Sequence, residues 1–198
     1  MSELKPMMQP FVLKISKIIS DVFNPLTAFV VYFAYQSSLH HTFKEAFWIF
    51  LPIFLIIIIP IIVWIFLKVK TGKYTDKDVS NRNQRKSLYF VIAGIIAVFM
   101  LYDWIFNENF DVRILFILML LVLLQISNYF IKSSMHTAFN VLASAFLFEL
   151  NPVFGIVWFI IAIVVGITRI ILKRHSLKEV LTGGFIAFAV SLIYILKF

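Results

Sequence analysis

The sequence has no cysteine among its 198 residues, and only 14% of the residues are charged. Without cysteine the chain can form neither a disulfide nor a thiolate metal site. Soluble domains carry about a quarter charged residues, so a chain this poor in charge leaves no part that could form a separate soluble domain. The net charge of +8 therefore favours anionic lipid or an anionic substrate, and we expect no nucleic-acid partner.

The N-terminus also lacks the apolar core and the small-residue cleavage site of a cleavable signal peptide. Residues 11–21 mix apolar side chains with Lys14, Lys17 and Asp21. Such a mixture is typical of a segment that lies in the membrane interface. We expect residues 1–21 to form an interfacial N-terminal segment.

Long apolar runs, in contrast, make up most of the chain, in which 62% of the residues are hydrophobic. A membrane-spanning helix needs about 20 mostly apolar residues. Candidate spans lie at 22–39, 46–67, 88–106, 114–131, 137–148, 153–172 and 180–196.

Two of these runs have unusual features. The run 46–67 has no charge but contains Pro52 and Pro60, which should kink it. The run 137–148 is short, so it is either a full crossing that includes its flanking residues or a buried core helix. We expect an all-α, polytopic membrane helical bundle of six to seven spans. It should form one integral membrane domain over residues 1–198, with a polar loop at 68–87.

The distribution of lysine and arginine predicts the orientation of this bundle. With seven crossings, one side receives the N-terminus, 68–87, 132–136 and 173–179. Of the 18 Lys and Arg residues, only Lys44, Arg113 and Lys197 lie on the other side, which leaves fifteen on the first. Cytoplasmic loops are enriched in Lys and Arg, so the first side should be cytoplasmic and the C-terminus should lie outside.

Three polar segments should meet at the basic face: residues 73–86, 132–137 and 168–179. They contain His136 and His175, whereas His40 and His41 belong to the opposite side. His136 follows Ser133 and Ser134, which can cap a helix. Two readings stay open for it: an interfacial histidine on a capped helix, or part of an anion site at a helix N-terminus.

His175 and Glu179 are four residues apart, which places the carboxylate one helical turn from the imidazole. A carboxylate that accepts the Nδ1 proton leaves Nε2 free to act as a nucleophile or base. However, residues 176–179 also fit a capping box, in which Glu179 binds the Ser176 amide. The sequence leaves both roles open.

Lys132 and Arg169 lie at the ends of apolar runs, where cations often serve as interfacial anchors. Their convergence with two histidines and a carboxylate favours another role. This set suits phosphoryl transfer, because cations neutralise the phosphate oxygens while one histidine attacks and the other protonates the leaving oxygen.

The order of these residues resembles the type 2 phosphatidic acid phosphatase family, which shares its core with the vanadium haloperoxidases. That family carries Lys-x6-Arg-Pro, then Pro-Ser-Gly-His, then Ser-Arg-x5-His-x3-Asp. The third pattern is matched by Arg169, His175 and Glu179, with Thr168 in place of Ser and Glu in place of Asp. In the second, Ser134 and His136 match.

This chain departs from the family at several positions. Ser133 and Met135 replace the Pro and Gly of the second pattern. In the first, Arg85 matches but Lys86 replaces the Pro, and the lysine position holds Asp78. We therefore transfer no lysine role to that position. Lys132, beside the second pattern, is the candidate to supply the missing charge.

The resemblance implies a phosphatase core inside the bundle and a metal-independent lipid phosphate phosphatase. It implies that His175 is the nucleophile, that Glu179 holds it, and that His136 protonates the leaving lipid oxygen. Phosphate would be bound by Arg85, Arg169 and Ser134. No metal and no cofactor are expected. The partners would be a lipid phosphate and membrane lipids, and the sequence does not define the lipid or the oligomeric state.

Two further hypotheses belong to other classes. The departures from the first two patterns fit a lipid-phosphate binding or transport protein on the same fold. A small channel or transporter fits less well, because the runs hold almost no ionisable residue at mid-depth. We expect a bacterial inner-membrane protein. In most bacterial members of the family the site faces outward, whereas the Lys and Arg distribution here predicts a cytoplasmic site.

Overall fold

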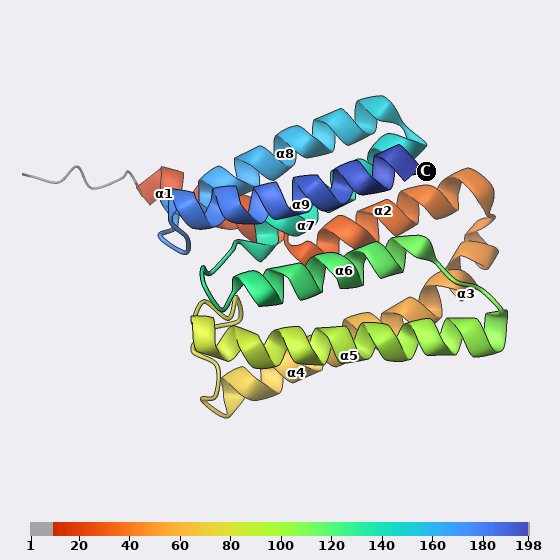
Figure 1. The fold of residues 1–198 in the computed structure, drawn as a ribbon, viewed down its shortest axis with the longest axis horizontal. Coiled ribbons are helices and arrows are strands. Elements are labelled where there is room, and N and C mark those ends of the chain that lie inside the picture. The colour runs from red at the N-terminus through yellow and green to blue at the C-terminus, as the bar shows by residue number, and fades with distance from the viewer. Residues whose placement is uncertain (1–9, 198) are drawn as a thin grey trace, which may run out of the picture.

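The computed structural model describes residues 10–197, which form helices and their connections, with no strand in that range (Figure 1). The helices are α1 (Pro10–Val22), α2 (Pro25–His40), α3 (Phe43–Ile53), the π-helical turn η1 (Phe54–Ile58), α4 (Ile59–Lys70), α5 (Arg82–Asn107), α6 (Val112–Ser127), α7 (Met135–Leu150), α8 (Pro152–Ile171) and α9 (Leu177–Lys197).

The all-helical class predicted from the sequence is confirmed. Four helical segments are long and apolar enough to cross a membrane: Phe43–Lys70, α5, α8 and α9. Helices α1 and α2 pass the same test together, but they are bent by 52° at their junction. Helices α6 and α7 are apolar but shorter. Four to five helical segments are thus candidate spans by length and composition, which indicates a membrane-embedded protein.

Helix α7 occupies the centre of the bundle. Every residue from Met135 to Leu147 is buried, and the helix packs against α2, α6, α8 and α9. The sequence left two possibilities for residues 137–148, and the observed burial agrees with a buried core helix. Its one buried amide, Asn140, donates to the Phe23 carbonyl and accepts from Trp158 Nε1. These bonds satisfy the amide and connect α7 to α8 and to the α1–α2 junction.

The segment Phe43–Lys70 is one long helix with a widened turn. Thr42 and Glu45 form a capping box at its start. Pro52 precedes η1 and Pro60 follows it. Proline removes a backbone donor and clashes with the preceding turn, so local π geometry is a common response. Large apolar side chains on this segment, such as Trp48 and Phe66, are exposed, as expected for side chains that face lipid.

The polar connections divide between the two ends of the bundle. Residues 71–81, 128–134 and 172–176 lie at the end where α1 begins, and the C-terminal end of α9 lies at the other (Figure 1). Hydrogen bonds link all three connections: Arg174 donates to Ser80 Oγ, and Lys132 donates to the Arg174 carbonyl. Arg85, in the first turn of α5, also donates to the Val79 and Ser133 carbonyls. The three polar segments therefore meet, and they build the candidate site.

Candidate active site

His175 lies in the turn between α8 and α9 and is buried. Its Nδ1 is 3.0 Å from Oε2 of Glu179, in the first turn of α9. The same oxygen accepts the backbone N–H of Ser176 at 3.0 Å, while Ser176 Oγ accepts the Glu179 N–H at 3.3 Å. Glu179 therefore makes both contacts that the sequence left as alternatives.

Arg85 fixes the tautomer of His175. This buried arginine lies in the first turn of α5, and its Nη2 is 3.1 Å from His175 Nε2. A guanidinium can only donate, so Nε2 must carry a lone pair. The ring proton then resides on Nδ1 and is donated to Glu179. His175 is held as a neutral imidazole whose Nε2 points toward a cation.

The backbone of two loops positions Arg85. Its Nε donates to the Val79 carbonyl and its Nη1 to the Ser133 carbonyl, both at 2.9 Å. Val79 has a φ of +47°, which is rare for a β-branched residue. Because Val79 is fully buried against Tyr74 and Leu88, packing holds it in this conformation and directs its carbonyl to Arg85.

Arg169, near the end of α8, is buried beside Asp78 and Ser20. Its Nη1 donates to Asp78 Oδ2 at 3.0 Å and to Ser20 Oγ at 2.7 Å. Its Nε and Nη2 are also buried but have no partner among residues 10–197. A buried donor without a partner costs about 1–3 kcal/mol. An anion placed there would satisfy both donors.

The N-terminus of α7 completes the site. Ser134 caps this helix by accepting from the Thr137 N–H, and its own N–H donates to the Glu179 carbonyl. His136, in the first turn, is buried and lines the same cavity as Arg85 and Asp78. Helix α9 approaches so closely that a Cβ on Gly183 would lie 2.8 Å from the Ser134 carbonyl oxygen.

Lys132 lies beside the carboxylate. Its Nζ donates to the Arg174 carbonyl at 2.9 Å and is 3.8 Å from Glu179 Oε2. Burial, together with the charges of Arg85 and Arg169, lowers the pKa of the Lys132 ammonium. The structure thus places Lys132 next to Glu179, where it adds positive charge behind His175.

The surroundings of His175 disfavour its protonated form. Burial is the main cause, and the positive charges of Arg85, Lys132 and Arg169 add to it, so the pKa of His175 lies far below its usual range. The imidazole is therefore neutral over the physiological range, which is the form a nucleophile requires.

All seven residues selected from the sequence lie at this end of the bundle: Lys132, Ser134 and His136 around the start of α7, Arg85 on α5, Arg169 on α8, and His175 and Glu179 around the start of α9. Sequence reasoning missed Ser20 as a partner of Arg169. It noted Asp78 only as an acid at a lysine position. Ser20 carried no signal, because a serine in an amphipathic helix has no distinctive pattern.

Within residues 10–197, no group of three or more His, Asp or Glu side chains is arranged to hold a metal ion. No protein-family model, curated protein or solved structure matches this chain.

Proposed function

We propose that this chain is a membrane-embedded lipid phosphate phosphatase of the type 2 phosphatidic acid phosphatase kind, with six to seven spans in a bacterial inner membrane. The observation that carries the proposal is a single buried site with a neutral His175 and two donors of Arg169 that lack a partner. A nucleophile beside an anion site is the arrangement that phosphoryl transfer to histidine requires.

In the proposed reaction the lone pair on His175 Nε2 attacks phosphorus. The bond between phosphorus and the lipid oxygen breaks, and that oxygen takes a proton from His136. The dianionic phosphate beside His136 favours the protonated imidazole that this step needs. Glu179 stabilises the positive charge that develops on the His175 ring.

In the second half of the reaction, water attacks the phosphohistidine and gives its proton to His136. The phosphorus–nitrogen bond breaks, its electrons return to Nε2, and inorganic phosphate leaves. Arg85, Arg169 and the N-terminus of α7 with Ser134 neutralise the phosphate oxygens throughout. When phosphate binds, Arg85 Nη2 would leave Nε2 of His175 and donate to a phosphate oxygen instead.

The test is phosphate release by the purified protein in detergent from a panel of lipid phosphates. We expect turnover by the wild type, loss of turnover in His175→Gln and His136→Gln, and a trapped phosphohistidine in the wild type. His41→Gln is the matched control, because His41 lies at the opposite end of the bundle and should keep wild-type activity. Turnover near the wild-type level in His175→Gln would show that the mechanism is wrong.

A second function is favoured by two contacts within the site. Asp78 accepts a hydrogen bond from Arg169 Nη1, which is then not free for phosphate. Arg85 Nη2 contacts Nε2 of His175, the atom that would attack phosphorus. A protein that binds or carries a lipid phosphate without hydrolysing it would tolerate both contacts. In the same assay, this alternative predicts saturable binding of a lipid phosphate with no release of phosphate.

A further inference from the structure

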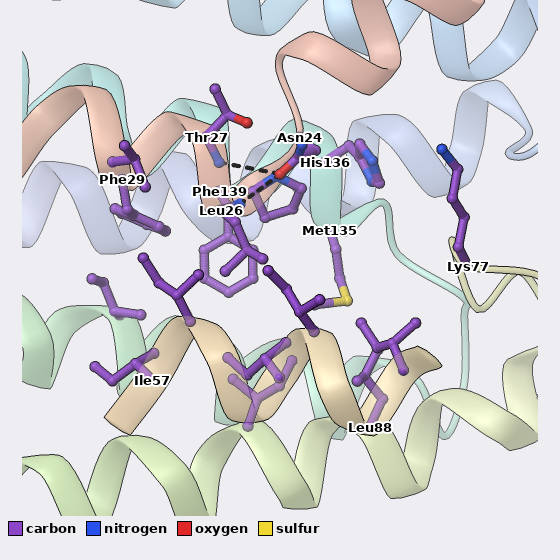
Figure 2. Close-up of a pocket in the computed structure, with 18 of the residues that line it drawn as sticks. Asn24, Leu26, Thr27, Phe29, Ile57, Lys77, Leu88, Met135, His136 and Phe139 are labelled. Atoms are coloured by element: carbon purple, nitrogen blue, oxygen red, sulfur yellow. Dashed lines mark hydrogen bonds between the residues drawn. The ribbon is translucent and has the colours of Figure 1, made fainter. Parts of the chain in front are cut away.

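An apolar groove begins at the candidate site and runs along the bundle. Its volume is about 660 Å³, and it lies between α2, the Phe43–Lys70 segment, α5, α6 and α7. Lys77 and His136 lie toward one end and Ile57 toward the other, with Leu26 and Phe139 between them (Figure 2). Apart from the polar groups near the site, most of the side chains that line the groove are isoleucine, phenylalanine, leucine and valine.

The groove is longer than one leaflet of a bilayer is deep. It extends from the site to Ile114, in the first turn of α6, whereas Ser127 at the other end of α6 is hydrogen-bonded to Ser133 beside the site. The 13 residues from Ile114 to Ser127 rise about 20 Å at 1.5 Å per residue. A leaflet contributes about half of the roughly 30 Å hydrocarbon core. With the phosphate site at the level of the lipid headgroups, a groove of this length would reach past the bilayer midplane.

A change in polarity marks the far end. Phe33, Phe50, Ile53 and Ile114 line both this groove and a second cavity of about 730 Å³. Beyond these residues the second cavity is lined by polar groups, including Asp103, Asn109 and Arg113. A hydrocarbon chain gains nothing by entering polar surroundings. The four residues shared by the two cavities therefore limit the length of the hydrocarbon chain that the groove can hold.

We propose that the groove holds the hydrocarbon tail of the substrate, and that this tail is long enough to pass the bilayer midplane. The substrate would be a lipid phosphate with a prenyl or acyl chain longer than those of a single leaflet. This inference rests on the proposed function, because the phosphate at His136 and Arg85 positions the start of the tail. Phe50, Ile53 and Ile114 would then determine chain length.

Selectivity for the length of the substrate tail should come mainly from steric fit. Lipid tails are as apolar as the groove, so transfer from the membrane into it gains little hydrophobic free energy. What a filled groove gains is close packing along the whole chain. A bulky side chain halfway along it would force a long tail out and would leave room for a short one.

The kinetic test compares prenyl and alkyl monophosphates that are shorter or longer than a leaflet. We expect kcat/KM to rise with length until the tail reaches Phe50 and Ile114. Ile57→Trp should lower the ratio of kcat/KM for long over short substrates by about tenfold, which is about 1.4 kcal/mol. Leu55→Trp is the matched control, because Leu55 is exposed on the same turn and does not line the groove; it should leave the ratio unchanged.

Two results would overturn this inference and leave the proposed phosphatase activity intact. One is a kcat/KM that does not change with tail length, and the other is an equal effect of Ile57→Trp and Leu55→Trp on the ratio. A comparison of the prenyl and alkyl series shows which type of chain fits better.

A second measurement does not depend on turnover. An alkyl phosphate longer than a leaflet, with a diazirine at its tail end, is photo-crosslinked to His175→Gln protein in detergent. Mass spectrometry should locate the adducts at Phe50, Ile53 or Ile114. Adducts confined to Leu88 and Met135, near the site, would overturn the proposed length. Deep adducts without hydrolysis of any lipid phosphate by the wild type would refute only the proposed function.

Discussion

At the level of single residues, one carboxylate oxygen has two tasks. Glu179 Oε2 accepts from His175 Nδ1 and also from the Ser176 amide. Both contacts are satisfied because His175 directly precedes Ser176, which caps α9. The capping box therefore holds the carboxylate in the position that orients the imidazole.

We expect Glu179→Gln to lower the rate of phosphate release roughly a hundredfold or more, as for other misoriented catalytic histidines. Glutamine still serves in a capping box, so the melting temperature should barely change. What is lost is the charge that stabilises a positive His175 ring. The measurement is phosphate release together with a thermal melt in detergent.

Ser176→Ala supplies the control for this experiment. It removes the hydroxyl of the capping box and should cost about 0.5–2 kcal/mol of stability, with little effect on the rate. If Glu179→Gln kept full activity and Ser176→Ala lost it, the carboxylate would be a cap without an orienting role.

In the proposed mechanism, Asp78 would compete with phosphate for Arg169. Its carboxylate lies 3.0 Å from Nη1 of a buried guanidinium. We expect Asp78→Asn to bind inorganic phosphate roughly tenfold more tightly, because it removes a negative charge and keeps a hydrogen-bond acceptor. Inhibition of turnover by inorganic phosphate measures this affinity.

Asp76→Asn is the matched control for Asp78→Asn. Asp76 pairs with Arg174, which is far more exposed than Arg169. Its removal should change phosphate inhibition by less than about twofold, since exposed ion pairs contribute little. Equal effects of the two substitutions would indicate a general charge effect and no competition at Arg169.

The lowered pKa of His175 makes a prediction about pH. A depressed pKa means that the ring stays neutral as the pH falls through about 6.5, where a free imidazole gains its proton. In ¹⁵N-histidine-labelled protein, the two ring nitrogens of His175 should keep the shifts of an Nδ1–H tautomer down to about pH 5. His175→Gln assigns the signals, and titration of this ring near pH 6.5 would contradict the burial argument.

At the level of elements, the contact between α7 and α9 holds the site together. Ser134, which caps α7, donates its N–H to the Glu179 carbonyl on α9, and Gly183 allows the close approach. Glycine is required here by space, because an added Cβ would lie 2.8 Å from the Ser134 oxygen and 2.9 Å from its nitrogen.

Gly183→Ala should therefore displace α9 from α7, cost about 1–3 kcal/mol of stability and reduce phosphate release. Gly184→Ala is the neighbouring control, since its Cβ would meet only Thr137 at 3.8 Å. We expect that variant to keep both its activity and its melting temperature. Equal behaviour of the two alanine variants in phosphate release and thermal melts would contradict the role of the close contact.

At the level of the whole molecule, charge is distributed unequally between the two ends of the bundle. Among residues 10–197, the site end carries most of the Lys and Arg, while Lys44 at the start of α3, Arg113 at the start of α6 and Lys197 at the end of α9 belong to the other end. Some cations at the site end belong to the proposed phosphate site. Without Arg85, Lys132, Arg169 and one more, ten cations among residues 10–197 still face three; Lys5 lies outside the described residues.

We therefore expect the site to face the cytoplasm and the C-terminus to lie outside. A C-terminal alkaline phosphatase fusion should be active. A single cysteine at Lys73, in the connection between α4 and α5, should resist an impermeant thiol reagent in intact spheroplasts. The cysteine-free sequence makes this labelling specific. Labelling at this position would show that the site faces outward.

Composition and short-range spacing were enough to predict several features of this protein. The apolar runs predicted helices, because each covers several turns with few charges. The spacing of His175 and Glu179 predicted their contact, since residues four apart lie on one face of a helix. The sequence also predicted that three polar segments meet, because alternate connections of a helical bundle lie at the same end. The number of membrane crossings stays a prediction.

The side chains that meet across these segments, in contrast, follow from long-range packing. Arg85 binds His175 over 90 residues, Arg169 binds Asp78 over 91, and Arg169 binds Ser20 over 149. No periodicity encodes such pairs, because they depend on how each helix is rotated and how far it extends. The groove has the same origin: the sequence gives no sign that its isoleucines differ from ordinary lipid-facing residues, and only the packing of α2, the Phe43–Lys70 segment, α5 and α7 gives them a shared cavity.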